Sequence, residues 1–158
     1  FNLVHAGAHA MDIMRMEKGY LHWGHDISPA ENPYEAGLDF AINMSKSEDF
    51  IGKESLLKNN KSKKKKLMMF TLDNSTPGNP LLLHDEPIYY NNKIVGETTS
   101  GNYSFNYNKN LAFGYIDNKL DLNSIDLNLF EIEVAKKKYK AKVLTQPLHD
   151  PNNLILKN

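Results

Sequence analysis

The sequence predicts an α+β protein: a short helix, a loop, a strand and a second helix, followed by a small antiparallel β-barrel. Three observations lead to this prediction. Residues 9–18 carry apolar side chains at helical spacing, residues 58–66 are rich in lysine, and every element recognisable from residue 67 onward is a short strand. We therefore divide the chain into residues 1–60, the end of a preceding domain, and residues 65–150, the barrel domain.

The first predicted helix covers residues 9–18. Met11 and Met14 lie on one face of this helix, three residues apart, and Gly19 is a suitable stop. The glycine and prolines of residues 24–36 then predict a loop with defined corners. The helix and the loop form the first half of the leading segment.

Residues 38–44 alternate between apolar and polar or small side chains, which predicts a half-buried strand. Residues 47–58 predict a short helix with Ser47 or Asp49 as its cap. The residues expected to face inward on this helix are Ile51, Leu56 and Leu57. These two elements complete the leading segment.

The lysine-rich segment, residues 58–66, separates the two parts of the chain. A basic run of this kind is found in proteins that contact nucleic acid and also in solvated linkers. No aromatic residue interleaves with these lysines, and aromatic side chains are what single-stranded nucleic acid stacks on. We therefore expect a solvated connection.

After the lysines, short apolar runs alternate with turn-forming residues, at intervals of about 8–12 residues, as in small barrels and sandwiches. The expected strands are residues 67–72, 87–90, 93–96, 98–105, 111–116, 130–134 and 138–143. Asn91 and Asn92 predict a tight hairpin because asparagine tolerates positive φ, and residues 135–137 predict a second one. Five to seven such strands predict the antiparallel barrel.

The composition excludes several classes of function. Lys+Arg and Asp+Glu both total 19, so no net charge attracts a polyanion or an anionic membrane. The chain contains no cysteine, which excludes disulfides, thiol catalysis and thiolate metal sites. A mean hydropathy of −0.54 and the lack of a long apolar run predict no membrane-spanning segment.

Arg15 is the single arginine among the 19 basic residues. Its planar guanidinium binds a carboxylate through two parallel hydrogen bonds and stacks on flat rings, neither of which lysine does. Arg15 is therefore a candidate ligand-binding residue. A structural ion pair with Asp12 or Glu17 is the alternative interpretation.

Residues 15–27 surround this arginine with aromatic, histidine and carboxylate side chains, including Trp23, the only tryptophan. Such a concentration is typical of a site for a flat polar ligand, although Tyr20 and Trp23 could equally be core residues beneath a loop. His22 and His25 have a spacing that could suit a metal, but no third ligand stands at a suitable spacing. We therefore predict no metal site.

Several ordered blocks resemble the glycine-cleavage T-protein family. Residues 15–26 read RMEKGYLHWGHD, residues 32–38 read NPYEAGL and residues 49–57 read DFIGKESLL. Further blocks are GETTSGNYS at residues 96–104, LAFGYI at 111–116 and PLHDP at 147–151. The wording is most similar to the aminomethyltransferase half of dimethylglycine and sarcosine dehydrogenases, and the resemblance covers nearly the whole chain.

This resemblance implies a tetrahydrofolate-dependent aminomethyltransferase that moves a one-carbon unit from a small amine donor to the pterin. It implies that Arg15 and Trp23 bind the folate cofactor, and that residues 1–60 come from the folate-binding domain. It also implies partner domains upstream in the same chain, one of which could hold FAD. Since Phe1 is not a methionine, we expect upstream residues, with a processed complete protein as the alternative.

The sequence departs from the family in its catalytic residues. The family's catalytic aspartate and its pterin-binding glutamate belong to upstream segments without a counterpart here, and residues 10–12 read Ala-Met-Asp where the family often has Ala-Arg-Asp. We therefore assign no catalytic residue, and we explain Asp12, Glu17 and Asp26 by helix termination and ion pairing. The 158-residue chain alone is expected to have weak or no transferase activity.

Two further interpretations remain to be tested. Thr99-Ser100-Gly101 lacks the Gly-x-Ser-x-Gly elbow of a nucleophile, so a bulge or bend at Gly101 with hydroxyls bonded to local backbone is expected. The alternative function for the whole chain is a non-catalytic barrel that binds RNA or a protein partner. The resemblance itself implies a cytoplasmic protein, or a mitochondrial-matrix protein in a eukaryote, without nucleic-acid or membrane partners.

Overall fold

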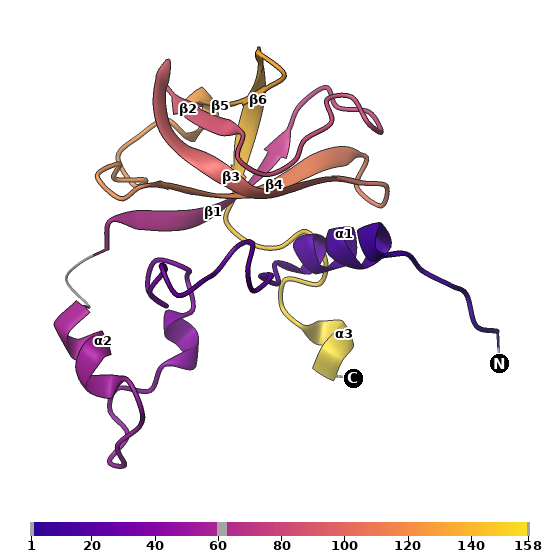
Figure 1. Ribbon diagram of the computed structural model, residues 1–158. Helices are drawn as coiled ribbons and strands as arrows, with labels where there is room; N and C mark the ends of the chain where they lie inside the picture. Colours follow the sequence, from indigo (N-terminus) through magenta and orange to yellow (C-terminus); the bar gives the residue numbers. More distant parts are fainter. Residues whose placement is uncertain (1, 60–62, 158) are drawn as a thin grey trace.

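The computed structural model describes residues 2–59 and 63–157. A β-barrel forms the upper part of the molecule in Figure 1, and the helices lie below it. The elements in chain order are α1 (Ala8–Lys18), η1 (Asp39–Ala41), α2 (Lys53–Asn59), β1 (Lys65–Leu72), β2 (Pro87–Tyr90), β3 (Lys93–Ser104), β4 (Lys109–Asp117), η2 (Leu127–Leu129), β5 (Phe130–Val134), β6 (Lys137–Leu144) and α3 (Leu154–Lys157).

The described strands close into an antiparallel barrel of six strands in the order β1-β4-β3-β2-β5-β6. This confirms the predicted fold class. Both predicted hairpin turns are present: Asn91 and Asn92 have φ of 47° and 63°, and Ala135 and Lys136 have φ of 49° and 65°. Paired positive φ values match the right-handed twist of the strands that such turns join.

Two predicted strands, residues 93–96 and 98–105, belong to one long strand, β3. The register of β3 against β4 shifts between Thr98 and Ser100, so Thr99 is the extra residue of a β-bulge. The bulge bends β3 without ending it.

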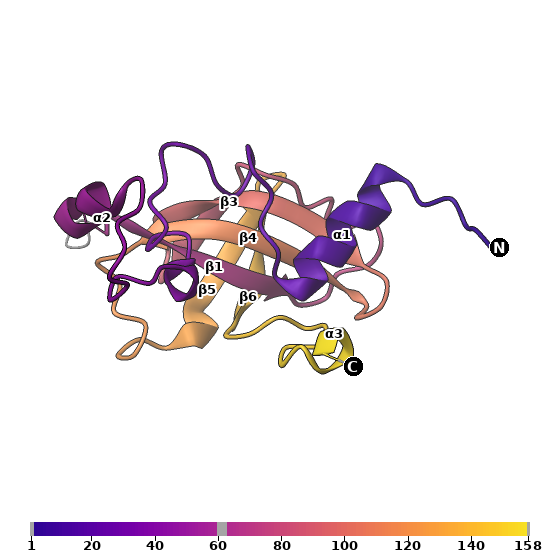
Figure 2. The ribbon, with the colours of Figure 1, turned by 90° about the horizontal axis from the view of Figure 1, so that it is seen from below.

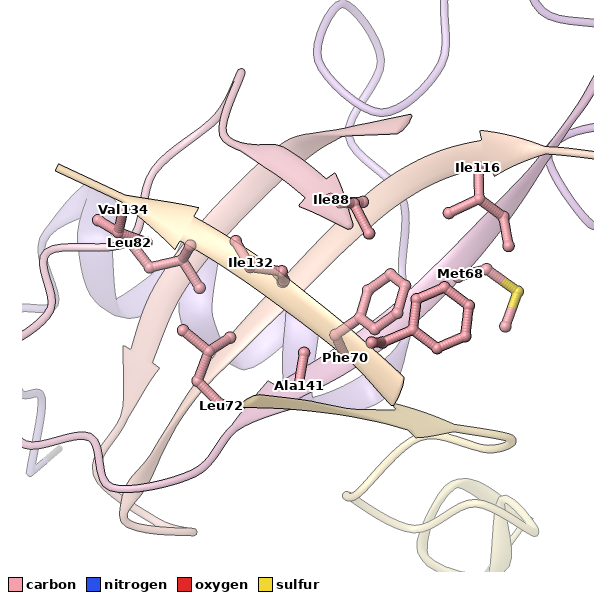
Figure 3. Close-up of a cluster of buried hydrophobic side chains, with 11 residues drawn as sticks. Met68, Phe70, Leu72, Leu82, Ile88, Ile116, Ile132, Val134 and Ala141 are labelled. Carbon is pink, nitrogen blue, oxygen red and sulfur yellow. The ribbon is translucent and has the colours of Figure 1, made fainter. Parts of the chain in front are cut away.

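The barrel interior is filled by alternate residues of its strands. Phe70, Leu72, Ile88 and Ile132 are buried there, and their side chains point toward one another in Figure 3. Burying a side chain of this size stabilises the fold by about 1.5–3 kcal/mol each relative to leaving it in water. The period of two in these strands thus determines which face closes on the core.

Strand β4 is buried on both faces. Ala112 and Ile116 belong to the barrel interior, whereas Leu111 and Phe113 pack outside the barrel against Met16 of α1. Figure 2 shows α1 running across β3 and β4. Because both faces of β4 are buried, residues 111–116 form a nearly continuous apolar run.

Helix α1 ends where the sequence predicts. Gly19 adopts the left-handed conformation with φ of 78°, its N–H donates to the Met16 carbonyl, and the Tyr20 N–H donates to the Arg15 carbonyl. These two bonds form a Schellman cap, which satisfies carbonyls at the end of a helix. The cap turns the chain sharply, so residues 20–27 return along the barrel.

The strand predicted for residues 38–44 is wrong. The chain forms the short 3-10 helix η1 there, and Phe40 is 84% exposed. An alternating pattern gives a strand only when a partner strand satisfies the backbone hydrogen bonds. In the fold, Leu38 instead donates to the Pro33 carbonyl, which closes a turn.

The second helix is shorter than predicted. It begins at Lys53 because Gly52 has a φ of 90°, which is incompatible with a right-handed helix. Ser47 and Asp49 therefore do not cap it. Ile51 and Leu57 are exposed, so the expected inward face is also wrong for these two residues.

The lysine-rich segment is only partly a connection. Residues 60–62 lie outside the described residues, and Lys65 and Lys66 already belong to β1. The ammonium of Lys63 lies 5.3 Å from the ring centre of Tyr34, and that of Lys65 lies 4.4 Å from the ring centre of Tyr115. The second half of the run is therefore ordered against the barrel and its neighbouring loop. No helix within residues 2–59 and 63–157 is long and apolar enough to cross a membrane.

Candidate functional site

A cavity of about 720 Å³ lies between α1, the loop after α1, the segment before β2, and β3. Four apolar side chains with large exposed fractions line this cavity, and together they are called its apolar wall: Met11, Leu81, Leu83 and Phe105. Arg15, Asp12, Ser100 and Asn102 supply polar groups to the same cavity. An apolar wall with a few converging polar groups is the usual form of a small-molecule site.

Arg15 lines this cavity, with 15% of its side chain exposed. A guanidinium has five N–H donors, and protein groups occupy all of them: Nε donates to Asp12, Nη1 to Asp26 and to the Tyr20 carbonyl, and Nη2 to Asp12 and to Ser100. The Phe113 ring lies 5.3 Å from the guanidinium carbon. The arginine is therefore held rigidly by contacts from α1, the loop and β3.

Asp26 is the buried partner of Arg15, with a side chain that is 0% exposed. Besides Arg15, its carboxylate accepts hydrogen bonds from the His22 N–H at 2.9 Å, the Thr99 hydroxyl at 2.6 Å and the Ser100 hydroxyl at 2.7 Å. Four donors and one full positive charge offset the loss of hydration that burial imposes on a carboxylate. Asp26 thus fixes the loop to β3.

Tyr115 supports Asp26 from β4. Its hydroxyl donates to the Asp26 carbonyl at 2.9 Å. Burial raises the pKa of Tyr115, and the nearby carboxylates of Glu31, Asp26 and Glu35 raise it further. The phenol therefore keeps its proton and remains a donor.

Two further charged residues of α1 bind other parts of the chain, Glu17 at the end of β3 and Lys18 in the segment after β6. Glu17 is buried and accepts from the Ser104 hydroxyl at 2.6 Å and from the Asn106 amide at 2.9 Å. Lys18 donates to the carbonyl of Asp150 at 2.6 Å and to its carboxylate at 3.1 Å. These contacts give Glu17 a structural role, but its partners are neutral donors, so the ion pair expected for Glu17 is not formed.

The Thr99-Ser100-Gly101 block differs from the prediction in its details. The bulge is present, but it is centred on Thr99, and the Thr99 and Ser100 hydroxyls donate to the Asp26 side chain instead of to local backbone. Gly101 has a separate reason to be glycine: a Cβ there would lie 2.6 Å from the Leu82 side chain and from the Leu83 carbonyl. Gly101 lets the segment before β2 approach β3 and form the cavity wall.

Trp23, the second residue predicted to bind a ligand, is 66% exposed and does not line the apolar cavity. Its neighbours His22 and His25 do line it, as does His84. Within the part of the chain that the structure describes, no group of three His, Cys, Asp or Glu side chains is placed to hold a metal ion.

The sequence could not reveal the cavity wall or the hydroxyls at Asp26. Thr99 and Ser100 lie 73 and 74 positions from Asp26 along the chain. Leu81 and Leu83 belong to a segment without regular structure, for which periodicity gives no signal. The only usable signal was the break in the β3 pattern.

A second hollow, of about 930 Å³, lies on the other side of the loop after α1. Its charged lining residues are Glu31, Lys63, Lys64, Lys65, Asp85, Glu97, Asp117 and Lys119. Positive and negative charges are equal in number, and Glu31 is already paired with Lys65 at 2.6 Å. The balance gives this hollow no preference for an ion of either sign.

Similarity to known proteins agrees with this architecture. Residues 65–150 match the family described as "Glycine cleavage T-protein C-terminal barrel domain", and residues 1–46 match the one described as "GCVT N-terminal domain". The crystal structure of glycine cleavage system aminomethyltransferase T from Bartonella henselae superposes with a TM-score of 0.74. That alignment covers 90% of this chain and 38% of that one at 22% identity, so it supports the fold alone.

Curated relatives agree with the family match. The chain is 39% identical to mitochondrial dimethylglycine dehydrogenase of Homo sapiens over 147 residues, which cover 90% of this chain and 16% of that protein. It is 36% identical to 4-methylaminobutanoate oxidase (formaldehyde-forming) of Paenarthrobacter nicotinovorans, over 92% of this chain and 17% of the relative. The chain thus spans about a sixth of the length of these relatives, and it belongs to the glycine cleavage T-protein C-terminal barrel domain family.

Proposed function

We propose that the chain is the C-terminal part of a tetrahydrofolate-dependent aminomethyltransferase, similar to dimethylglycine or sarcosine dehydrogenase. In this proposal the apolar cavity forms part of the folate site, and Arg15 and Trp23 contribute to it. The observation that carries the proposal is that Arg15, the single arginine, lines the apolar cavity while a buried carboxylate holds it in place. The family to which the chain belongs supports this interpretation.

The residues of the cavity fit a folate. A folate has a flat ring system, which suits the apolar wall of Met11, Leu81, Leu83 and Phe105, and it has polar ring edges, which suit Ser100 and Asn102. The volume of about 720 Å³ lies within the range of about 300–1,000 Å³ that is typical of small-molecule sites. Trp23 does not line the cavity itself, but it follows His22, which does, and its exposed indole would be available to a part of the ligand that extends beyond the cavity.

Bound tetrahydrofolate would supply the acceptor nitrogens for a one-carbon unit from an amine. The chain's own residues would orient and shield it. Arg15 places a fixed positive charge at the cavity, and the wall residues exclude water from the ring. Because all five N–H groups of Arg15 already have protein partners, it acts through its charge or by exchanging one of these bonds.

We assign no catalytic residue to the chain. Asp12 and Asp26 are both ion-paired with the Arg15 guanidinium, which gives each a structural role. The 158-residue chain alone is therefore expected to transfer little or no methylene group. The amine donor, an upstream FAD-dependent part and a cytoplasmic or mitochondrial-matrix location belong to the proposal for the whole protein.

Calorimetric titration of the chain tests this proposal. We expect 5-formyltetrahydrofolate, a stable folate, to bind with an affinity that changes little between 50 and 300 mM salt. A short single-stranded RNA is the comparison ligand, because binding to phosphates weakens steeply with salt. Salt-sensitive RNA binding without folate binding would contradict the proposal.

A further inference from the structure

Histidine side chains are concentrated around the apolar cavity. The chain has six histidines, and four of them line this cavity: His9, His22, His25 and His84. All four are exposed, so a ligand in the cavity can reach them from solvent. They come from α1, from the loop after α1 and from the segment before β2, so only the fold brings them together.

Three of these histidines lie near one another, with His25 close to both of the others. The ring centres of His22 and His25 are 4.6 Å apart, and those of His25 and His84 are 6.4 Å apart. His84 Nδ1 lies 2.6 Å from the Asp85 carboxylate. Among residues 2–59 and 63–157, no hydrogen bond engages the ring nitrogens of His22 or His25, so these imidazoles present polar groups to a ligand.

Arg15 is less available than these histidines to donate hydrogen bonds to a ligand. Asp12, Asp26, Ser100 and the Tyr20 carbonyl occupy its five donors. A carboxylate that enters the cavity would have to displace one of these partners to reach the guanidinium. The imidazoles of His22 and His25 require no such exchange, so they are the donors that a carboxylate meets first.

We propose that His22, His25 and His84 form a carboxylate-binding rim, which holds the acidic tail of a ligand whose flat ring lies on the apolar wall. The inference rests on the proposed folate function, in which the glutamyl carboxylates of the folate supply this tail. Met11 and Phe105 supply apolar surface and the histidine rim supplies donors, so the cavity offers both kinds of contact that such a ligand needs.

A metal ion is not the occupant that the geometry favours. Histidine is the commonest metal ligand in proteins, but the described residues contain no group of three side chains placed to coordinate an ion. Unlike metal coordination, hydrogen bonding to carboxylates does not require the imidazoles to converge on one point. Three separate imidazoles suit an extended anion with more than one carboxylate.

The charges around the rim make carboxylate binding depend on pH. Imidazoles take up a proton between about pH 8 and pH 5, and a protonated imidazole binds a carboxylate more strongly than a neutral one does. Asp12 and Arg15 of α1 line the same cavity, Asp26 accepts from the His22 backbone N–H, and Asp85 and Glu86 lie beside His84. His25 also lines the second hollow, whose charged residues are equal in number for the two signs.

The experiment compares two ligands that differ only in their carboxylates. The 158-residue chain is titrated at pH 6 and pH 8, with a chelator present, using 5-formyltetrahydrofolate and its diamide, in which both glutamyl carboxylates are neutral. We expect the acid to bind roughly fivefold more tightly at pH 6, as for an exposed charge pair, and the diamide to show no such gain. The triple variant His22→Gln, His25→Gln, His84→Gln should lose the gain.

His149→Gln is the matched control, because His149 is also exposed but does not line the cavity. It should keep the full pH effect. Equal binding of acid and diamide at both pH values, or an unchanged triple variant, would overturn the rim while leaving the folate proposal intact. Failure of both ligands to bind at either pH would reject both ideas.

Discussion

Arg15 and Asp26 form an ion pair that joins α1 to the loop after it, and Ser100 of β3 contacts both residues. The Arg15 side chain is largely buried and that of Asp26 is completely buried. A buried pair is costly to break from one side only, because the remaining charge stays out of water. This ion pair therefore determines how the helix and the loop sit on the barrel.

Asp26→Asn should lower the free energy of unfolding by about 3 kcal/mol, since the Arg15 charge would lose its buried partner. Chemical denaturation measures this change. Asp12→Asn is the matched control, because Asp12 pairs with the same guanidinium but its side chain is 33% exposed, so a loss of about 1 kcal/mol or less is expected. Equal losses for the two variants would argue against a dominant role for Asp26.

Arg15→Lys should weaken binding of 5-formyltetrahydrofolate at least about tenfold and lower stability by about 1–3 kcal/mol. Lysine keeps the charge, but it has three donors and no planar fork, so it cannot serve Asp12, Asp26, Ser100 and the Tyr20 carbonyl together. Calorimetry and denaturation measure the two effects. Lys18→Arg is the control and should bind folate normally, because Lys18 contacts Asp150 outside the cavity. If Arg15→Lys binds folate as tightly as the wild type, Arg15 does not belong to the proposed site.

Met16→Ala should destabilise the protein by about 2–5 kcal/mol, because Met16 is fully buried between α1 and β4 and its loss leaves a cavity. Thermal or denaturant unfolding measures the loss. Met14→Ala lies on the same helix but removes an exposed side chain, so its effect should stay within about 0.5 kcal/mol. A small effect at Met16 would mean that α1 is not firmly packed on the barrel.

Gly101→Ala should destabilise the fold by about 1–3 kcal/mol and weaken folate binding. The added Cβ would meet the Leu82 side chain and the Leu83 carbonyl at 2.6 Å, which pushes the cavity wall away from β3. Gly7→Ala is the control, because a Cβ at Gly7 meets nothing within 4 Å. Unfolding and calorimetry on both variants check the prediction, and unchanged folate binding by Gly101→Ala would place the ligand elsewhere.

The Glu31–Lys65 pair should make stability fall in acid. Burial alone would raise the pKa of Glu31, but hydrogen bonds from Lys65 and Ser28 outweigh it, so the pKa lies below its ordinary value. The contribution is therefore present above about pH 4.3 and is lost as the pH falls through the lowered pKa. Glu31→Gln should lower the free energy of unfolding by about 1 kcal/mol at most at pH 7. The difference between variant and wild type should disappear as the pH falls from 7 to 3, as measured by denaturant unfolding at each pH. A difference that stays constant with pH would contradict this assignment.

The barrel was predictable because its strands carry their own signals. Alternating residues around Phe70 and Ile132 mark the interior face, and Asn91 and Asn92 mark a hairpin that tolerates positive φ. Residues 38–44 carry a similar alternation without a partner strand, so the pattern alone predicted a strand that the fold does not form. Local pattern predicts a strand only where long-range pairing supports it.

The candidate site was predictable in part. Arg15 was identified because it is the single arginine, and it does line a cavity. The hydroxyls of Thr99 and Ser100 were not connected to Asp26, because contacts between residues more than 70 positions apart leave no periodic trace in one sequence. The exposure of Trp23 was not predictable either, because it depends on which parts of the folded chain cover the indole and not on the neighbouring residues in the sequence.

The burial of β4 on both faces has a consequence for how the chain can be divided. The two family matches end at residue 46 and begin at residue 65, as if the halves were separable modules. Yet Leu111 and Phe113 are buried in a cluster that includes Met16, Ile13 and Leu21 from the first half. A chain beginning at residue 65 would therefore expose a hydrophobic surface on β4 and should tend to aggregate. A full-length chain cleaved between residues 46 and 65 should keep its two fragments associated, and they should elute together in gel filtration.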